Sequence, residues 1–166
     1  HPERLRGVAV VAPDVGDGEL EALHAAGVRG IRINVLFGGG VAIDEMERLA
    51  ARVAPLGWHI QLLIDARNLP ELGPRIAGLP VEVVIDHMGR FDAAVDFADK
   101  SWRATMKFLG TGRCWVKLSG PYYGSKSGPP AYADKARVAK ALIKAAPERM
   151  VWASNWPHPS FKKEFP

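Results

Sequence analysis

The stretch VEVVIDHMGR (residues 81–90) is a short apolar β-type run that ends directly in a polar cluster, Asp86 to Arg90. A second stretch, RMVWASNWPHP (residues 149–159), repeats the pattern with Asn155 and His158. Polar residues that follow a strand at its carboxyl end are where α/β barrels build their active sites. The two stretches therefore predict the scaffold of an enzyme, with its site at the ends of parallel strands.

Strand-like and helix-like patterns alternate along the whole chain, and this alternation with short connections predicts a parallel sheet covered by helices. The strand patterns cover Gly7–Val11, Val28–Val35, Trp58–Ile64, Val81–Ile85, Cys114–Ser119 and Met150–Ala153. The helix patterns cover Gly18–Ala26, with Asp17 as expected N-cap and Gly27 after its end, and Asp44–Ala54, Leu69–Ala77, Ala93–Leu109 and Tyr132–Ala145.

The spacing of these units suits a (β/α)8 TIM barrel of about 250 residues. Only six strand patterns are present, so we interpret residues 1–166 as a single, incomplete barrel domain. Two strands and the closing C-terminal helix are expected to lie outside it. An open doubly wound sheet is the alternative, although the Gly-rich phosphate loop that such sheets carry after the first strand is missing.

The composition narrows the class of protein. The chain has 166 residues, 48% of them hydrophobic, a formal net charge of +4 and one cysteine. Its basic residues are scattered, so we expect no nucleic-acid partner, and its apolar runs are too short to cross a membrane. A lone cysteine, Cys114, fits a reducing compartment, and we expect a cytoplasmic protein.

His87 is the leading candidate for chemistry. Period-2 alternation is expected to point it to the same side as Val83 and Ile85, into the barrel, where it can ligate a metal, polarise a carbonyl or shuttle a proton. The alternative is a histidine that merely bonds a neighbouring carbonyl at the strand end. A hydrolytic zinc site needs about three protein ligands, and the chain offers His87 as the main candidate and His158 as a weaker one, so the ligand set is incomplete and no cofactor is certain.

Asn155 and His158 form a second candidate catalytic cluster. An amide cannot accept a proton from water, so Asn155 can only orient a carbonyl or a water molecule. His158 stands between Pro157 and Pro159 and is a candidate for the missing base. The alternative is that Trp156 and Pro157 plug the barrel mouth while His158 faces solvent.

Candidate substrate-binding residues lie on two strands. Arg32 and Asn34 share a face of GIRIN, where a guanidinium offers a forked pair of donors to a carboxylate. A structural ion pair, with Asp65 for example, is the alternative for Arg32. Lys117 and Ser119 share a face of WVKLS, where the ammonium can stabilise an oxyanion or neutralise a substrate carboxylate. The alternative for Lys117 is a structural pair with a carboxylate across strands.

Two further residues complete the predicted binding set. Tyr122 lies in a long loop, residues 121–128, which is expected to be flexible and to act as a lid. Arg90, the last residue of the DHMGR segment, is assigned to substrate binding with it.

Six segments together resemble strands three to eight of the amidohydrolase-superfamily barrels related to 2-pyrone-4,6-dicarboxylate lactonase. In order, they are GVAVVAP, GVRGIRINV, GWHIQLLID, VVIDHMGR, CWVKLSGPY and RMVWASNWPHP. The resemblance implies a TIM barrel that hydrolyses a lactone or a related small carboxylated compound, and Arg32 corresponds to one of the arginines that grip a dicarboxylate. The chain departs from that family in lacking a His-x-His pair, in having Asn155 at the position of an aspartate, and in having Leu63 at the position of a tyrosine.

We therefore expect a hydrolase for a small anionic lactone or carboxylated ester, with a carbonyl polarised at the barrel mouth. One alternative is a metal-dependent decarboxylase or hydratase, with zinc, on the same barrel. Another is a degenerate barrel that binds a carboxylate without turnover. The expected partners are the small anionic substrate and either further copies of the chain or a complementing chain that supplies the missing strands.

Overall fold

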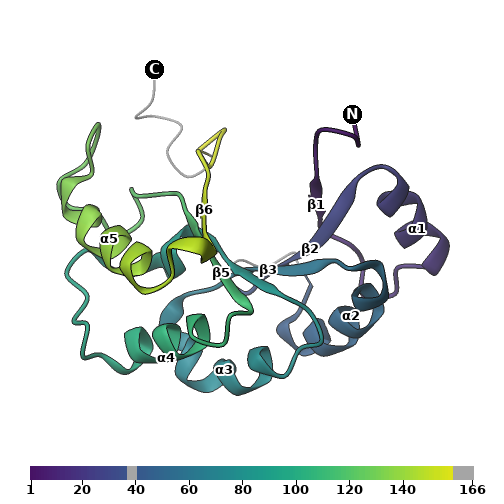
Figure 1. Ribbon diagram of the computed structural model, residues 1–166, viewed down its shortest axis with the longest axis horizontal. Coiled ribbons are helices and arrows are strands. Elements are labelled where there is room, and N and C mark those ends of the chain that lie inside the picture. Colours follow the sequence, from purple (N-terminus) through teal and green to yellow (C-terminus); the bar gives the residue numbers. More distant parts are fainter. Residues whose placement is uncertain (37–40, 159–166) are drawn as a thin grey trace.

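A curved, six-stranded parallel sheet forms the centre of the computed structural model, which describes residues 1–36 and 41–158. The strands follow each other in chain order, from β1 to β6, and every neighbouring pair is parallel. Figure 1 shows α1 to α5 arranged along one side of this sheet, so that the sheet is an open half-barrel with its helices outside. The strands are β1 (Gly7–Ala9), β2 (Val28–Asn34), β3 (His59–Leu63), β4 (Val83–Ile85), β5 (Cys114–Leu118) and β6 (Met150–Trp152).

The expected barrel architecture is confirmed as a partial barrel, and the doubly wound alternative is wrong. A doubly wound sheet has helices on both faces and a reversal of strand order, and neither occurs in the described residues. The helices are α1 (Asp17–Ala25), α2 (Met46–Val53), α3 (Leu69–Ala77), α4 (Lys100–Leu109) and α5 (Ala136–Ala145). Short 3-10 segments cover Ile43–Glu45, Ala54–Leu56, Ala66–Asn68, Ala133–Lys135 and Pro147–Arg149, and Asp86–Arg90 forms a non-helical turn after β4.

The largest differences from the predicted elements lie at helix starts. The helix expected from Ala93 begins only at Lys100, because the side chain of Asp99 accepts a hydrogen bond from the Ser101 N–H at 2.7 Å and caps it. Gly16, and not Asp17, is the N-cap of α1. Gly27, predicted to follow that helix, does adopt a left-handed conformation (φ 99°).

The two faces of the sheet have different compositions. Because paired residues of parallel strands point to the same side, the register assigns Ile33, Leu62, Ile85 and Val116 to one face. All four side chains are at most 1% exposed, beneath the helices. The other, concave face carries polar side chains, among them Arg32, Gln61 and Lys117.

The two ends of the sheet are open. Within the described residues, β1 and β6 each pair with one strand only. Apolar side chains near these edges are exposed: Val10 by 62%, Trp152 by 78% and Trp156 by 80%. No described helix is long and apolar enough to cross a membrane.

Candidate functional site

The segment Asp86–Arg90 turns sharply at the end of β4. His87, Met88, Gly89 and Arg90 all have left-handed backbone angles, with φ between 53° and 62°. Such angles in residues other than glycine cost about 1 kcal/mol or more each and persist only where the surroundings enforce them. A side chain at Gly89 would bring its Cβ to 2.8 Å from the Ala66 Cβ, so the close approach of the turn to its neighbour requires glycine there.

This turn gives the His87 side chain a different orientation from the one that strand alternation predicts. Strand alternation would align His87 with Ile85, but Ile85 faces the helices and not the barrel interior. Asp86 instead continues the concave face after Val84, and the left-handed backbone at His87 redirects its ring. His87 Nδ1 therefore lies 2.8 Å from the Ser119 Oγ at the end of the neighbouring strand β5.

Asp86 is the centre of the charged cluster. Its carboxylate is 1% exposed and lies 2.9 Å from the Arg32 guanidinium and 3.0 Å from the Lys117 ammonium. The Gln61 side chain donates to Asp86 Oδ2 at 3.0 Å and accepts from Lys117 Nζ at 2.8 Å. Two cations thus share one carboxylate, and the cluster retains a net positive charge.

Asp86 is also the ion partner that the sequence interpretation missed. Arg32 was given Asp65 as its alternative partner, but Asp65 binds the neighbouring Arg67, whose Nε lies 2.9 Å from Oδ1. The sequence shows that Asp86 has the same parity as Val84, but only the strand register shows that Val84 pairs with Gln61 on the concave face. Gln61 was not predicted either, although it pairs with Arg32 in the register and its amide lies on the same concave face.

His87 is a neutral imidazole at pH 7. Burial lowers its pKa to about 4; Asp86 opposes the shift, whereas Arg32, Lys117 and Arg90 add to it. Ser119 is 2% exposed, and its hydroxyl has His87 Nδ1 as its hydrogen-bond partner. A buried hydroxyl needs an acceptor, so we infer that Ser119 donates to Nδ1 and that the ring proton is on Nε2.

These residues line one cavity of about 280 Å³. The structure brings together five of the predicted residues, namely Arg32, His87, Lys117, Ser119 and Asn155. Gln61, Asp86, Ala153, Ser154 and Trp156 complete its wall. The cavity is thus polar, positively charged and bordered by a neutral histidine and an amide.

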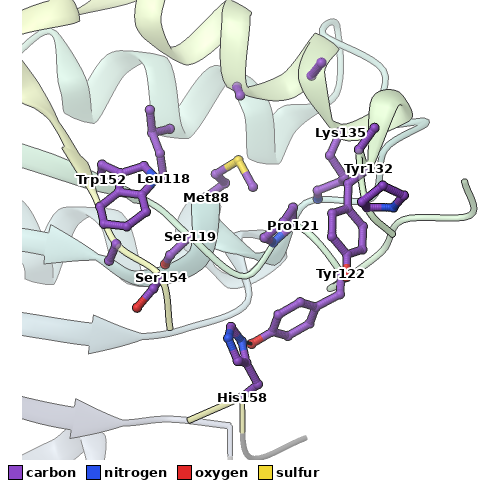
Figure 2. A pocket seen from close by; sticks show the side chains of 15 residues that line it. Met88, Leu118, Ser119, Pro121, Tyr122, Tyr132, Lys135, Trp152, Ser154 and His158 are labelled. Carbon is purple, nitrogen blue, oxygen red and sulfur yellow. Dashed lines mark hydrogen bonds between the residues drawn. The ribbon is translucent and has the colours of Figure 1, made fainter. Parts of the chain in front are cut away.

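Tyr122 and His158 lie in an adjoining cavity of about 380 Å³, which shares Ser119, Ala153 and Ser154 with the first. Figure 2 shows the Tyr122 hydroxyl directed at the His158 ring, and Oη lies 3.4 Å from Nδ1. The Asn155 amide donates a short hydrogen bond to the same hydroxyl. His158 therefore does not line the cavity of His87, and its contact with that cavity runs through Tyr122 and Asn155.

The other two predicted binding residues lie elsewhere. The Arg90 guanidinium is 4.1 Å from the centre of the Tyr123 ring and lines a separate cavity with Asp65 and Asp92. Asn34 shares the concave face with Arg32, as predicted, but its side chain accepts from the Leu36 N–H at 3.1 Å. Neither residue lines the cavity of Asp86 in the described part of the chain.

The loop that was expected to be a flexible lid is tied down at several points. Asp134 accepts hydrogen bonds from the Ser125 and Ser127 hydroxyls at 2.6 and 2.7 Å, and these bonds lower the pKa of its carboxyl. The Tyr123 ring packs against the His87 ring, with 5.2 Å between the ring centres. Gly120 allows this packing, because a Cβ at position 120 would lie 2.7 Å from the Tyr123 ring. The loop is therefore a fixed wall of the site in this structure.

The described residues do not fit a metal ion. They contain no group of three or more His, Cys, Asp or Glu side chains placed to hold one. Among the described residues, the cavity has one carboxylate beside His87, that of Asp86, and it already pairs with Arg32 and Lys117. Both cations would repel a bound metal ion. No step of the chemistry below is therefore assigned to a metal.

A curved parallel sheet with its helices outside and a polar cavity at the carboxyl ends of its strands defines the class of (β/α) barrel proteins. Within that class, the amidohydrolase family model matches residues 1–166. The chain belongs to the amidohydrolase family.

Individual relatives agree with this assignment. The chain is 36% identical over 173 residues to the 2-pyrone-4,6-dicarboxylate hydrolase of Comamonas testosteroni, covering 98% of the chain and 57% of that protein. It is 31% identical over 161 residues to the D-galactarolactone isomerase of Agrobacterium fabrum, covering 97% of the chain and 55% of that protein. The chain thus spans about half the length of the curated relatives that it matches.

A solved structure confirms the fold. A probable 2-pyrone-4,6-dicarboxylic acid hydrolase from Acinetobacter baumannii, crystallised with citric acid bound, superposes with a TM-score of 0.82 at 28% identity. The match covers 99% of this chain and 62% of that one. The six described strands are therefore a portion of an amidohydrolase TIM barrel.

Proposed function

We propose that the protein that carries this chain hydrolyses a small anionic lactone or a related carboxylated ester. The observation that carries the proposal is the buried Asp86 shared by Arg32 and Lys117, which leaves one positive charge unbalanced beside His87 and Asn155. Two relatives whose names specify lactone substrates, and a structural neighbour solved with the carboxylic acid citrate, support this substrate class.

Arg32 and Lys117 bind the carboxylate of the substrate in this proposal. Asp86 contacts Arg32 through Nη2, and Nε is buried, so the donors left for a ligand are those of the terminal nitrogens. The Arg32 side chain is 33% exposed and the Lys117 side chain 20%. Both cations are therefore accessible from the cavity while Asp86 holds them in place.

His87 polarises the lactone carbonyl. A neutral imidazole with its proton on Nε2 donates a hydrogen bond without introducing a further charge beside Arg32 and Lys117. The negative charge that develops on the carbonyl oxygen as water adds is stabilised by this donor and by the excess positive charge of the cluster. The low pKa of His87 keeps the ring in this state at neutral pH.

Asn155 orients the attacking water. Its side-chain NH2 group donates to Tyr122, and its side-chain oxygen, Oδ1, accepts no hydrogen bond within the described residues, which leaves Oδ1 for a water molecule. An amide does not take up the proton that the water loses, and we assign that proton to His158.

Exchange of Arg32 for lysine tests the substrate class. In the protein carrying all of its natural sequence, Arg32→Lys is expected to raise the KM for an anionic lactone about tenfold, because a forked pair of donors becomes a point charge. Arg29→Lys is the matched control, since Arg29 lies on the same strand but donates to the His24 carbonyl at 2.8 Å. An unchanged KM in Arg32→Lys, or no hydrolysis across a panel of anionic lactones, contradicts the proposal.

A further inference from the structure

Gln61 has no part in the reaction proposed above, although it lies at the centre of the charged cluster. Its side chain is buried on the concave face of β3, beside Arg32 in the strand register. Nε2 donates to Asp86 Oδ2 at 3.0 Å, and Oε1 accepts from Lys117 Nζ at 2.8 Å. One amide therefore connects the buried carboxylate to one of the two cations that are assigned to the substrate.

An amide is the side-chain group that suits this position. It has a donor for the Asp86 carboxylate and an acceptor for the Lys117 ammonium, and it satisfies both neighbours in one orientation. A carboxylate at position 61 would have no donor for Asp86, and an apolar side chain would have neither group. The amide is also neutral, so it leaves one positive charge of the cluster unbalanced for an anionic ligand.

The direction of the Lys117 ammonium depends on Gln61. Nζ lies 3.0 Å from Asp86 Oδ1, but Oδ1 accepts no aligned hydrogen bond within the described residues. The bond to Gln61 Oε1 is therefore the directional contact of this ammonium, and it uses one of three N–H donors. Since the Lys117 side chain lines the cavity and is partly exposed, the other donors are available to a ligand.

We propose that Gln61 is a positioning residue for carboxylate binding, because its amide aligns Lys117 and holds Asp86 between the two cations. Arg32 lies 2.9 Å from Asp86 Oδ2, the same oxygen that accepts from Gln61, so the amide fixes the partner of both cations. The inference rests on the proposed binding of an anionic substrate in this cavity. It does not depend on which group accepts the proton of the attacking water.

Equilibrium binding of benzoate tests this role without turnover. Benzoate has one carboxylate on a planar ring and no ester bond to hydrolyse. In the protein with all of its natural sequence, Gln61→Met is expected to raise the Kd for benzoate about fivefold at pH 8, because both hydrogen bonds of the amide are lost. Methionine has a side chain of similar length, so the packing on β3 is retained.

Gln61→Glu gives a pH signature that a merely structural role does not produce. At pH 8 the added carboxylate cancels the excess positive charge and has no donor for Asp86, so the Kd for benzoate is expected to rise about tenfold. Two carboxyl groups that share a site hold one proton strongly. Once protonated, the added carboxyl has the donor, the acceptor and the neutral charge of the amide. The affinity is therefore expected to return toward that of the unaltered protein as the pH falls to 5.5, where benzoate is still an anion.

Two controls isolate position 61. The unaltered protein is titrated in parallel, because other ionisable groups face the cluster from β2, β3, β5 and the turn after β4. They are Arg32, His59, Asp86, His87 and Lys117. Asn68→Asp is the matched control for an added negative charge, since Asn68 is exposed at the start of α3 and does not line the cavity. It is expected to leave the Kd for benzoate unchanged at both pH values.

Two results overturn the role of Gln61. One is a Kd for benzoate that Gln61→Met leaves unchanged, and the other is a loss in Gln61→Glu that is equal at pH 8 and pH 5.5. If Gln61→Met does not fold, the titration of Gln61→Glu decides alone. An unaltered protein that binds no benzoate contradicts the anionic substrate and this inference together. Benzoate binding that follows the expected pattern without hydrolysis of any lactone contradicts the proposed reaction and leaves the role of Gln61 intact.

Discussion

At the scale of single residues, the site depends on a neutral histidine beside two cations. His87 has a pKa of about 4 in the folded protein and about 6.5 when unfolded, because burial and its charged neighbours disfavour the imidazolium. Between these two values the unfolded chain binds more protons than the folded one. The contribution of His87 to stability is therefore complete above about pH 6.5 and declines as the pH falls toward about 4.

This linkage predicts a change in the pH dependence of stability. In His87→Gln, the free energy of unfolding is expected to fall less steeply than in the unaltered protein as the pH is lowered from 6.5 to 4. Urea unfolding at a series of pH values measures both slopes, and their difference isolates His87 from the carboxylates that titrate nearby. Parallel curves would show that His87 is not desolvated in the folded protein.

At the scale of elements, the left-handed turn after β4 sets the geometry of the cavity. Gly89→Ala is expected to lower the free energy of unfolding by about 1–3 kcal/mol, because a side chain there meets both a disfavoured φ of 62° and the Ala66 Cβ at 2.8 Å. Gly18→Ala, within α1 and with open space around it, is expected to raise stability by about 0.5 kcal/mol. Chemical denaturation of both variants checks the contrast, and a loss in both counts against the steric argument.

The sequence predicted the order of elements because each strand and helix has a local signature. Apolar runs bounded by turn residues located all six strands, although each strand is one or two residues shorter than its predicted range. The residues of the cavity were harder to assign, because a side chain that follows a strand no longer obeys strand alternation. His87 reached the site through its left-handed backbone, and the role of Asp86 depends on cations from β2 and β5, which sequence spacing does not bring together.

At the scale of the whole molecule, the open edges of the half-barrel are its least supported part. Amide hydrogen exchange on the 166-residue chain is expected to be slowest in β3, β4 and β5, and fastest in β1 and β6, since each of the latter pairs on one side only. Mass spectrometry of exchanged peptides measures this gradient. Uniform protection across all six strands would mean that the edges are covered in solution.

The same edges suggest how the domain is completed. We propose that two further strand–helix units, on the same polypeptide or on a complementing chain, pair with β1 and β6 and cover apolar side chains such as Val10 and Val151. Adding such a segment is expected to slow exchange in β1 and β6 and to leave β4 unchanged. Protection of the edges that instead grows with protein concentration alone would indicate association between copies of this chain.

The strictly sequential strand order also has a consequence for biosynthesis. Each strand of the described sheet pairs with the strand before it in the chain, so no pairing waits for a distant segment. As the polypeptide leaves the ribosome from its N-terminal end, each new unit finds its docking edge already formed. The sheet can thus grow in the direction of translation, and the cavity assembles last, when residues 150–158 emerge beside Tyr122 and Ser119.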